Sequence, residues 1–207
     1  MLNIIKDQES MNKRNTKKLL LTLISVTVLM YGCSSIKPKH NIVNEINADF
    51  KNNPTAAGGK IYYVCDTGDD NNSGTSYLAP FKTFSRGLSA FNTMSGGDSV
   101  LFCKGGKFPA PNRNTLFNQK CSANLVCTLG AYGEGNKPEI FSTGQTAALY
   151  FTDGGAPSPS KGYVVKDLAL VSDNTTMFGI ELFNDVDDVT IENVHIQGFG
   201  IGVYSAG

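Results

Sequence analysis

Short apolar runs separated by polar turns dominate the chain from about residue 60 onward. Ile61–Cys65 (IYYVC) and Ser99–Cys103 (SVLFC) are rich in aromatic and β-branched residues, which predicts two strands. Glycine pairs at Gly96-Gly97 and Gly105-Gly106 lie on either side of the second run and mark turns. This part of the chain is therefore expected to consist mainly of short strands.

One segment between those runs has the period of a helix. Phe81, Phe84, Leu88 and Phe91 recur at spacings of three or four residues, so they line one face of an amphipathic helix. Thr83 stands near its start and is expected to act as the N-cap. The pattern predicts an all-β chain with one amphipathic helix.

An internal repeat follows the helix. Residues 163–170 (YVVKDLAL) match residues 189–196 (VTIENVHI) without a gap at a shift of 26 residues. A second match places 178–182 over 199–203 at a shift of 21, and Leu149–Phe151 resembles the same strand one repeat earlier. Strands that keep their register while turns vary in length are typical of a solenoid.

The chain begins with the pattern of an export signal. A cluster of Lys and Arg at 13–18 precedes the apolar run Leu19–Tyr31. This run has 13 residues, whereas a membrane-spanning helix needs about 20. Residues 1–32 are therefore interpreted as a cleaved signal, with Met11 as an alternative start.

A cysteine follows at the expected cleavage site. Met30–Cys33 (MYGC) resembles the lipobox of bacterial lipoproteins, which implies acylation of Cys33 and attachment to the cell envelope. Ser34 after it favours the outer membrane. The alternative is an ordinary secretory signal with an incidental Cys. Residues 33–59 are polar, contain Pro and end in Gly-Gly, so they are expected to form a lipidated tether.

Charge and cysteine content narrow the expected partners. Residues 1–32 hold five of the 18 basic and two of the 18 acidic residues, which leaves the rest of the chain at about −3. There is no basic block, so nucleic acid is not an expected partner. Because CxxC spacing is absent, two disulfides of open pairing are favoured over a zinc site. The cysteines concerned are Cys65, Cys103, Cys121 and Cys127.

The order of these features resembles a known family. The strand YYV, the loop 66–74, PFKT, the helix and GDSVLF resemble the start of pectate-lyase-like, right-handed parallel β-helix proteins, and residues 125–140 resemble the entry to their first coils. The resemblance implies that residues 60–112 form an N-terminal cap and residues 113–207 the first coils of such a β-helix. Because solenoids usually need further coils and a closing cap, the fold is expected to be incomplete at the C-terminus.

The resemblance also assigns two residues to the turns. In this family, the turn within a coil commonly holds an Asn that stacks on its equivalents. The period of two in residues 189–196 is reset at Glu192-Asn193, so Asn193 is expected to stack on Asp167, one coil earlier. His195 then points outward, where a lone His is expected to be solvated rather than catalytic.

The strand before each such turn is where pectate-lyase-like enzymes usually hold their substrate. Inward Ile180 and Leu182 place their neighbours outward, and an aromatic pair beside an acidic cluster would contact a sugar ring and gather calcium. The expected glycan-facing residues are Glu181, Phe183, Asp185, Asp187, Asp188 and Tyr204, with Phe183 stacked near Tyr204. The alternative is an acidic turn beside an aromatic contact that only stabilises the sheet.

The implied function is a polysaccharide lyase, or part of one, that acts on or binds acidic polysaccharide at the cell envelope. Calcium is its candidate cofactor, and the catalytic residues are not identified. Lys166 is an outward base, but it lies on a turn away from the candidate face. A non-catalytic surface module that binds glycan or partners, and an inactive remnant of a longer β-helix protein, are the alternatives.

The loop before the helix invites a second calcium hypothesis. Residues 69–80 mimic the first half of an EF-hand loop, but the twelfth position is Pro80 instead of the bidentate Glu. A looser calcium site formed by Asp66, Asp69 and Asp70 remains a candidate. Asx turns that join the strand to the helix are the favoured interpretation.

Overall fold

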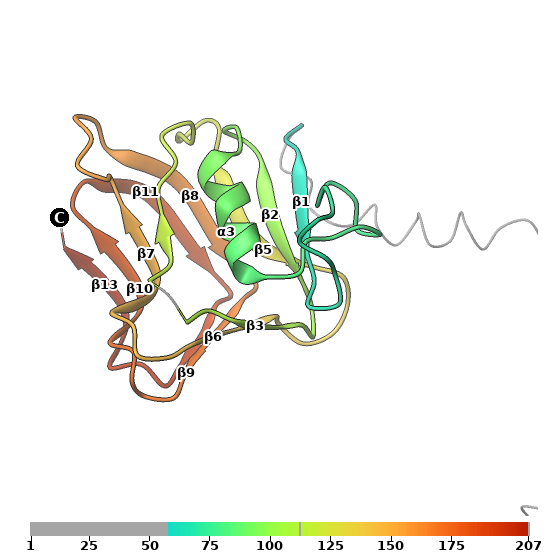
Figure 1. The fold of residues 1–207 in the computed structure, drawn as a ribbon. Helices are drawn as coiled ribbons and strands as arrows, with labels where there is room; N and C mark the ends of the chain where they lie inside the picture. Colours follow the sequence, from blue (N-terminus) through green and yellow to red (C-terminus); the bar gives the residue numbers. More distant parts are fainter. Residues whose placement is uncertain (1–57, 112, 207) are drawn as a thin grey trace, which may run out of the picture. The chain divides into compact units, whose positions relative to one another are not determined.

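The computed structural model describes residues 58–111 and 113–206. Short strands predominate there, with a single α-helix in this part of the chain (Figure 1). In chain order the elements are β1 Ile61–Val64, α3 Phe84–Thr93, β2 Ser99–Cys103, β3 Lys107–Pro109, β4 Thr115–Leu116, β5 Cys127–Tyr132, β6 Glu139–Ser142, β7 Ala147–Thr152, β8 Ser160–Lys166, β9 Ala169–Ser172, β10 Phe178–Phe183, β11 Val186–Glu192, β12 His195–Gln197 and β13 Ile201–Ala206. The predicted mostly-β composition with one helix is confirmed.

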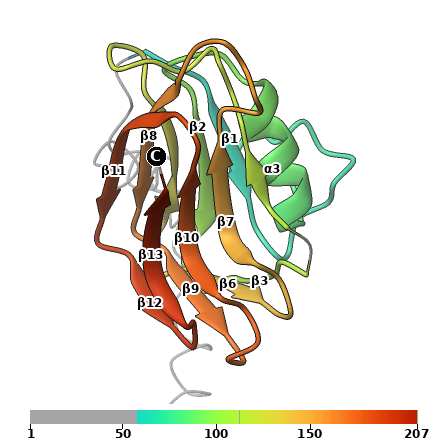
Figure 2. The ribbon, with the colours of Figure 1, turned by 90° about the vertical axis from the view of Figure 1, so that its left-hand side faces the viewer.

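The strands form three parallel sheets. The first sheet has the order β1-β2-β5-β8-β11, the second β3-β6-β9-β12 and the third β4-β7-β10-β13. From β2 to β13 the chain visits the first, second and third sheets in that order, four times in succession. Each round adds one strand to each sheet, as Figure 2 shows for β7, β10 and β13.

The predicted repeat is correct in one sheet and wrong in another. Tyr163 lies opposite Val189, so the shift of 26 residues is the register of β8 and β11. In the third sheet, however, Phe178 lies opposite Ile201 instead of Phe199, which makes the shift 23. The error arose because Phe199 and the glycine after it repeat the start of β10 but lie in the turn before β13. Since it amounts to two residues, the assignment of side chains to faces survives.

The turns between the first and second sheets stack on one another as expected. Asp167 and Asn193 both have positive φ, 59° and 52°, a conformation that Asn and Asp tolerate better than most residues. The Asn193 side chain donates a hydrogen bond of 2.6 Å to Asp167, and Lys137 donates one of 2.8 Å to Asn193. This confirms the predicted stacking of Asn193 on Asp167.

Rows of apolar side chains fill the space between the sheets. Leu116, Phe151 and Leu182 are in register across β4, β7 and β10, and all three belong to or pack against the core. Tyr163 enters this core from the first sheet, with its ring 5.1 Å from that of Phe151 and 5.9 Å from that of Phe91 on the helix. The three sheets therefore share one core.

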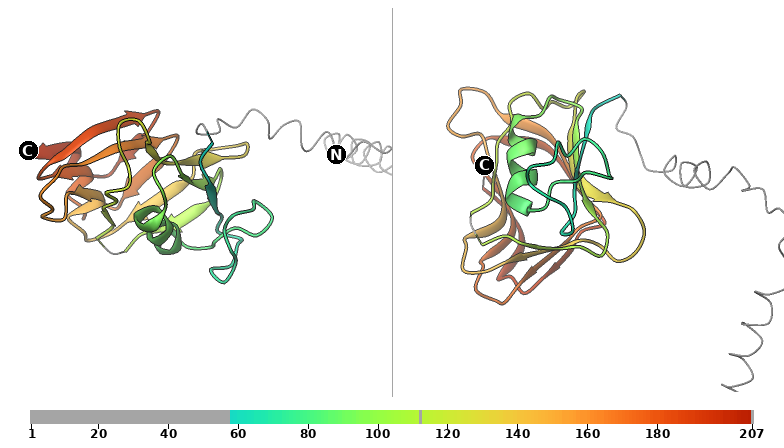
Figure 3. Two further views of the ribbon diagram at one scale, coloured as in Figure 1. Left: turned by 90° about the horizontal axis from the view of Figure 1, so that it is seen from above. Right: turned by 45° about the vertical axis from the view of Figure 1, so that its right-hand side comes forward.

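Helix α3 covers the end at which the sheets begin. It contacts β1 and β4, which are edge strands of the first and third sheets, and β2, which lies next to β1 (Figure 3). Thr83 accepts a hydrogen bond of 3.1 Å from the backbone of Arg86, so the predicted N-cap is confirmed. Of the predicted apolar face, Phe84 and Phe91 are fully buried, whereas Leu88 is half-buried.

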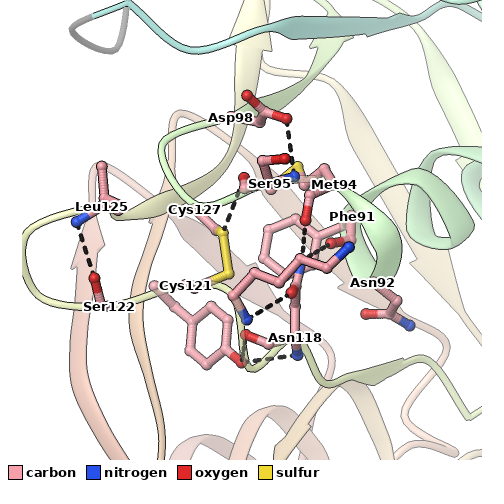
Figure 4. Close-up of a disulfide and its surroundings, with 12 residues drawn as sticks. Phe91, Asn92, Met94, Ser95, Asp98, Asn118, Cys121, Ser122, Leu125 and Cys127 are labelled. Atoms are coloured by element: carbon pink, nitrogen blue, oxygen red, sulfur yellow. Dashed lines mark hydrogen bonds between the residues drawn. A yellow bond between two sulfur atoms is a disulfide. The ribbon is translucent and has the colours of Figure 1, made fainter.

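A buried asparagine closes the other end of α3. The Asn118 side chain donates to the backbone oxygens of Phe91 (2.7 Å) and Met94 (3.0 Å), which have no partner within the helix (Figure 4). Its backbone N–H donates in turn to the Tyr163 hydroxyl over 3.0 Å. The disulfide Cys121–Cys127 lies directly beside this network. The loop after β4 thus holds the helix against the core.

The cysteine pairing, which the sequence left open, is resolved in the structure. Cys65 bonds to Cys103 and so joins the ends of the paired strands β1 and β2. Cys121 bonds to Cys127 and closes the short loop before β5. Both bonds lie in the part of the chain that contains α3 and the first strands of each sheet.

Candidate functional site

The third sheet presents a row of polar and aromatic side chains to the outside. Neighbouring residues of a strand point to opposite faces, and Leu116, Phe151 and Leu182 point into the core. The residues one position earlier therefore face outward. In register across the sheet they are Thr115 on β4, Tyr150 on β7, Glu181 on β10 and Tyr204 on β13.

Glu181 is the unusual member of this row. It is only 5% exposed although it points away from the core, and its Oε2 atom has no hydrogen-bond partner. In the described residues, Oε2 is the one buried side-chain nitrogen or oxygen without a partner. Buried polar groups are almost always hydrogen-bonded, so this atom calls for a functional explanation.

Glu181 lies between Tyr150 and Tyr204 in the register of the sheet, and further aromatic rings and one cation contact these two tyrosines. Tyr150, its neighbour on β7, is 7% exposed and lies beneath the Arg113 guanidinium, which is 3.6 Å from the ring centre. The Phe183 ring lies 5.8 Å from that of Tyr150, and Phe178 stacks on Tyr204 at 4.7 Å. We call Arg113, Tyr150, Phe178, Glu181, Phe183 and Tyr204 the outer aromatic face.

The predicted contact between Phe183 and Tyr204 is wrong. A shift of 21 residues would have placed the two opposite each other, but the shift of 23 places Ala206 opposite Phe183 and Tyr204 opposite Glu181. Sequence reasoning also missed Arg113, Tyr150 and Phe178. The pattern of Leu149–Phe151 contained a signal for Tyr150, because it identified that strand as the equivalent of β10.

The three acidic residues predicted to accompany these aromatics lie in and before another sheet. Asp187 and Asp188 belong to β11 and thus to the first sheet, while Asp185 lies in the turn that leads to it. All three are exposed, and Asp187 stands opposite Lys161. The sequence suggested an acidic turn here because Asp187 and Asp188, the second and third residues of β11, are of a type that normally disfavours strands.

The side chains that could bind a metal ion in the described part of the chain take part in other bonds. The one group of three His, Cys, Asp or Glu residues within ligand distance of each other is Cys65, Asp66 and Cys103. Its two sulfur atoms form a disulfide and therefore cannot act as thiolate ligands. Asp66 in addition accepts a hydrogen bond of 2.9 Å from the backbone of Lys107.

The loop before α3 uses its carboxylates to hold its own backbone. Asp69 accepts from the backbone and the side chain of Asn71, which is an Asx turn. Asp70 accepts from the backbones of Lys82 and Thr83 and from the Thr83 hydroxyl, at 2.8–2.9 Å. Burial by itself would raise the pKa of the Asp70 carboxyl, but these hydrogen bonds lower it on balance.

A hollow of about 530 Å³ lies at the start of α3. Its walls come mainly from Phe84, Phe108 and prolines, with Lys82 and Lys107 among the charged residues. No buried polar group without a partner lies among its lining residues. The outer aromatic face has such a group, so we consider that face the better candidate site.

Three sequence predictions lie outside the described residues or almost so. The export signal of residues 1–32, the acylation of Cys33 and the tether of residues 33–59 concern a segment of which the structure describes only residues 58 and 59. Among the described residues, no helix has the length and apolar character needed to cross a membrane.

Comparisons with known proteins point to one kind of enzyme. No family model matches the chain. The lacto-N-biosidase of Bifidobacterium longum subsp. longum is 32% identical over 155 residues, which cover 72% of this chain but only 9% of that protein. Two crystal structures of a GH136 lacto-N-biosidase from Eubacterium ramulus, one native and one selenomethionine-labelled, are similar in fold. Their TM-scores are 0.51 and 0.52 at 20% and 19% identity, over 74% of this chain and 28% of theirs.

These findings correct the family and function predicted from the sequence. The resemblance to pectate-lyase-like proteins and the function as a polysaccharide lyase, or part of one, are wrong. The similarity in sequence and fold is to lacto-N-biosidases, and the described residues form three parallel sheets rather than a solenoid of the pectate-lyase type. The motifs that carried the resemblance lie where the parallel sheets begin. They concern the fold, and proteins that share a fold can catalyse different reactions.

Proposed function

We propose that this chain is part of a glycoside hydrolase that acts on glycans containing lacto-N-biose, and that its outer aromatic face holds the saccharide. The observation that carries the proposal is the 155-residue match to a lacto-N-biosidase. The matched segment covers less than a tenth of that relative. That this chain itself hydrolyses a glycan is therefore proposed here and has to be tested. The exported, envelope-bound location predicted from residues 1–33 would place it where extracellular glycans are available.

We further propose that the three sheets are the sides of a right-handed parallel β-helix. The repeated visit to the first, second and third sheets supports this interpretation, since each round adds one coil. Connections between parallel strands are right-handed in about 98% of cases, which supports the hand. Residues 60–112, with α3, then form the N-terminal cap, and residues 113–207 form coils.

The outer aromatic face suits a saccharide on chemical grounds. Binding sites for small molecules combine aromatic walls with a few well-placed polar groups. Here Tyr150, Phe183 and Tyr204 supply the walls, and Glu181 and Arg113 supply the polar groups. Hydrolysis of a glycosidic bond commonly uses two carboxyl groups at a defined separation. We therefore assign saccharide binding to this face and leave the assignment of a catalytic pair open.

The experiment is to incubate the 207-residue chain with a chromogenic lacto-N-bioside and to titrate it with free lacto-N-biose by calorimetry. Release of the chromophore would support the whole proposal. Saturable binding without release would support the saccharide-holding role and contradict hydrolysis by this chain. If neither occurs with protein that shows a cooperative thermal transition, the proposal is wrong. Oligogalacturonate serves as the acidic comparison ligand.

Acylation at Cys33 has its own test. Cells that express the chain are grown with a labelled fatty acid, and the label is expected on the wild-type chain but not on Cys33→Ala. Label retained on the variant would contradict the predicted attachment site.

A further inference from the structure

The carboxylate of Glu181 lacks a structural explanation within the fold. Its Oε2 atom is buried and unpartnered, and the side chain is 5% exposed on a face that points away from the core. The nearby cation, Arg113, lies over the ring of Tyr150 instead. An unsatisfied buried acceptor destabilises a folded protein, so its retention indicates a ligand that supplies the missing donor.

The neighbours of Glu181 indicate what kind of ligand fits. Tyr150 and Tyr204 stand on either side of it, in register on β7 and β13, so the acceptor lies between two aromatic residues of one row. Phe183 and Phe178 extend this surface through their contacts with the two tyrosines. A ligand on this face needs apolar faces for the rings and a hydroxyl or amide N–H for the carboxylate, and a neutral sugar has both.

We propose that Glu181 determines sugar specificity on the outer aromatic face by accepting a hydrogen bond from a hydroxyl or N-acetyl N–H group of a neutral sugar. This inference rests on the proposed function and names the chemistry of its site. An ionised carboxylate accepts hydrogen bonds but does not donate them, so it selects donors. It also disfavours a uronic acid at the same position, because two like charges would be brought together.

The test compares Glu181→Gln with wild-type protein, using the full 207-residue chain. Glutamine has nearly the same shape, removes the charge and keeps one acceptor. Calorimetric titration with lacto-N-biose is expected to show about 10- to 100-fold weaker binding for the variant, as for the loss of a hydrogen bond to a charged group. Titration with digalacturonate is expected to show the opposite change, with weak binding to wild type and tighter binding to the variant. Glu192→Gln, at an exposed position on β11, is the matched control and should match wild type for both ligands.

The outcomes separate this inference from the function on which it rests. If wild-type protein binds lacto-N-biose and Glu181→Gln binds it within about twofold, the role of Glu181 is refuted while saccharide binding stands. If wild-type protein binds neither sugar, both proposals fall. Calcium alone is titrated as a third ligand, and calcium binding that is lost in Glu181→Gln would refute the sugar role in favour of a cation site. Thermal unfolding of each variant verifies that binding differences do not come from loss of the fold.

Discussion

Glu181→Met is expected to make the protein more stable. The wild-type side chain is 5% exposed, with Oε2 unpartnered, so folding removes a carboxylate oxygen from water without replacing its hydrogen bonds. Leaving such a group unsatisfied costs about 1–3 kcal/mol, and more when it is charged. Methionine has a similar length and adapts to irregular apolar surroundings, so it removes this cost without leaving a large cavity. The free energy of unfolding should therefore rise by about 1–3 kcal/mol.

The assay is urea unfolding followed by circular dichroism, with thermal unfolding in parallel. For a domain of this size, about 1 kcal/mol corresponds to about 2–4 °C in Tm, so Glu181→Met should melt roughly 2–12 °C above wild type. Glu192→Met, on the exposed part of β11, should change the free energy of unfolding by less than about 0.5 kcal/mol. A Glu181→Met protein that is less stable than wild type would refute the reasoning, because the carboxylate would then be satisfied in the folded state. A gain in stability combined with a loss of lacto-N-biose binding is the trade-off expected of a functional residue.

Three further predictions concern the scaffold. Replacing Cys65 and Cys103 together by Ser should lower the free energy of unfolding by about 4 kcal/mol, because their bond closes a loop with a sequence separation of 38; urea unfolding measures this, and an unchanged midpoint would contradict it. Tyr163→Phe should cost about 1–3 kcal/mol in the same assay, since it leaves the buried backbone N–H of Asn118 without its acceptor. Asp70→Asn should reduce the free energy of unfolding at neutral pH. Folding lowers the pKa of the Asp70 carboxyl from 3.8, so the carboxylate stabilises the fold fully above that value. This stabilisation is lost as the pH falls through the lower pKa of the folded state. The difference in Tm between Asp70→Asn and wild type should accordingly shrink in strong acid, and a difference independent of pH would contradict this.

The local elements of the fold were predictable because each depends on neighbours in the sequence. Phe84 and Phe91 have helical spacing, and Thr83 supplies the cap whatever surrounds it. The run Ser99–Cys103 became β2 with the same bounds. The stacking of Asn193 on Asp167, which the resemblance implied, was placed correctly because the repeat of 26 residues kept its spacing.

The candidate site was only partly predictable, because it depends on the register between distant strands. Glu181 was expected to point outward, and the period of two was enough for that. Which residues stand beside it depends on the number of residues in the turns, and the similarity of Phe199 to Phe178 led to a register that was wrong by two. That error paired Phe183 with Tyr204 and left Tyr150 out.

By itself, the sequence determined the helix and those strands that carry a clear period, together with the face that their side chains take, since the periods of two and 3.6 residues are properties of the local backbone. Only the tertiary structure decided that Cys65 pairs with Cys103, that Asp187 belongs to another sheet than Phe183, and that an outward glutamate is buried. These facts depend on contacts between residues far apart in the chain, and such contacts are set by how the strands of the three sheets are paired and packed. The contact of Arg113 with the Tyr150 ring, and the position of Tyr150 opposite Glu181, are contacts of this kind.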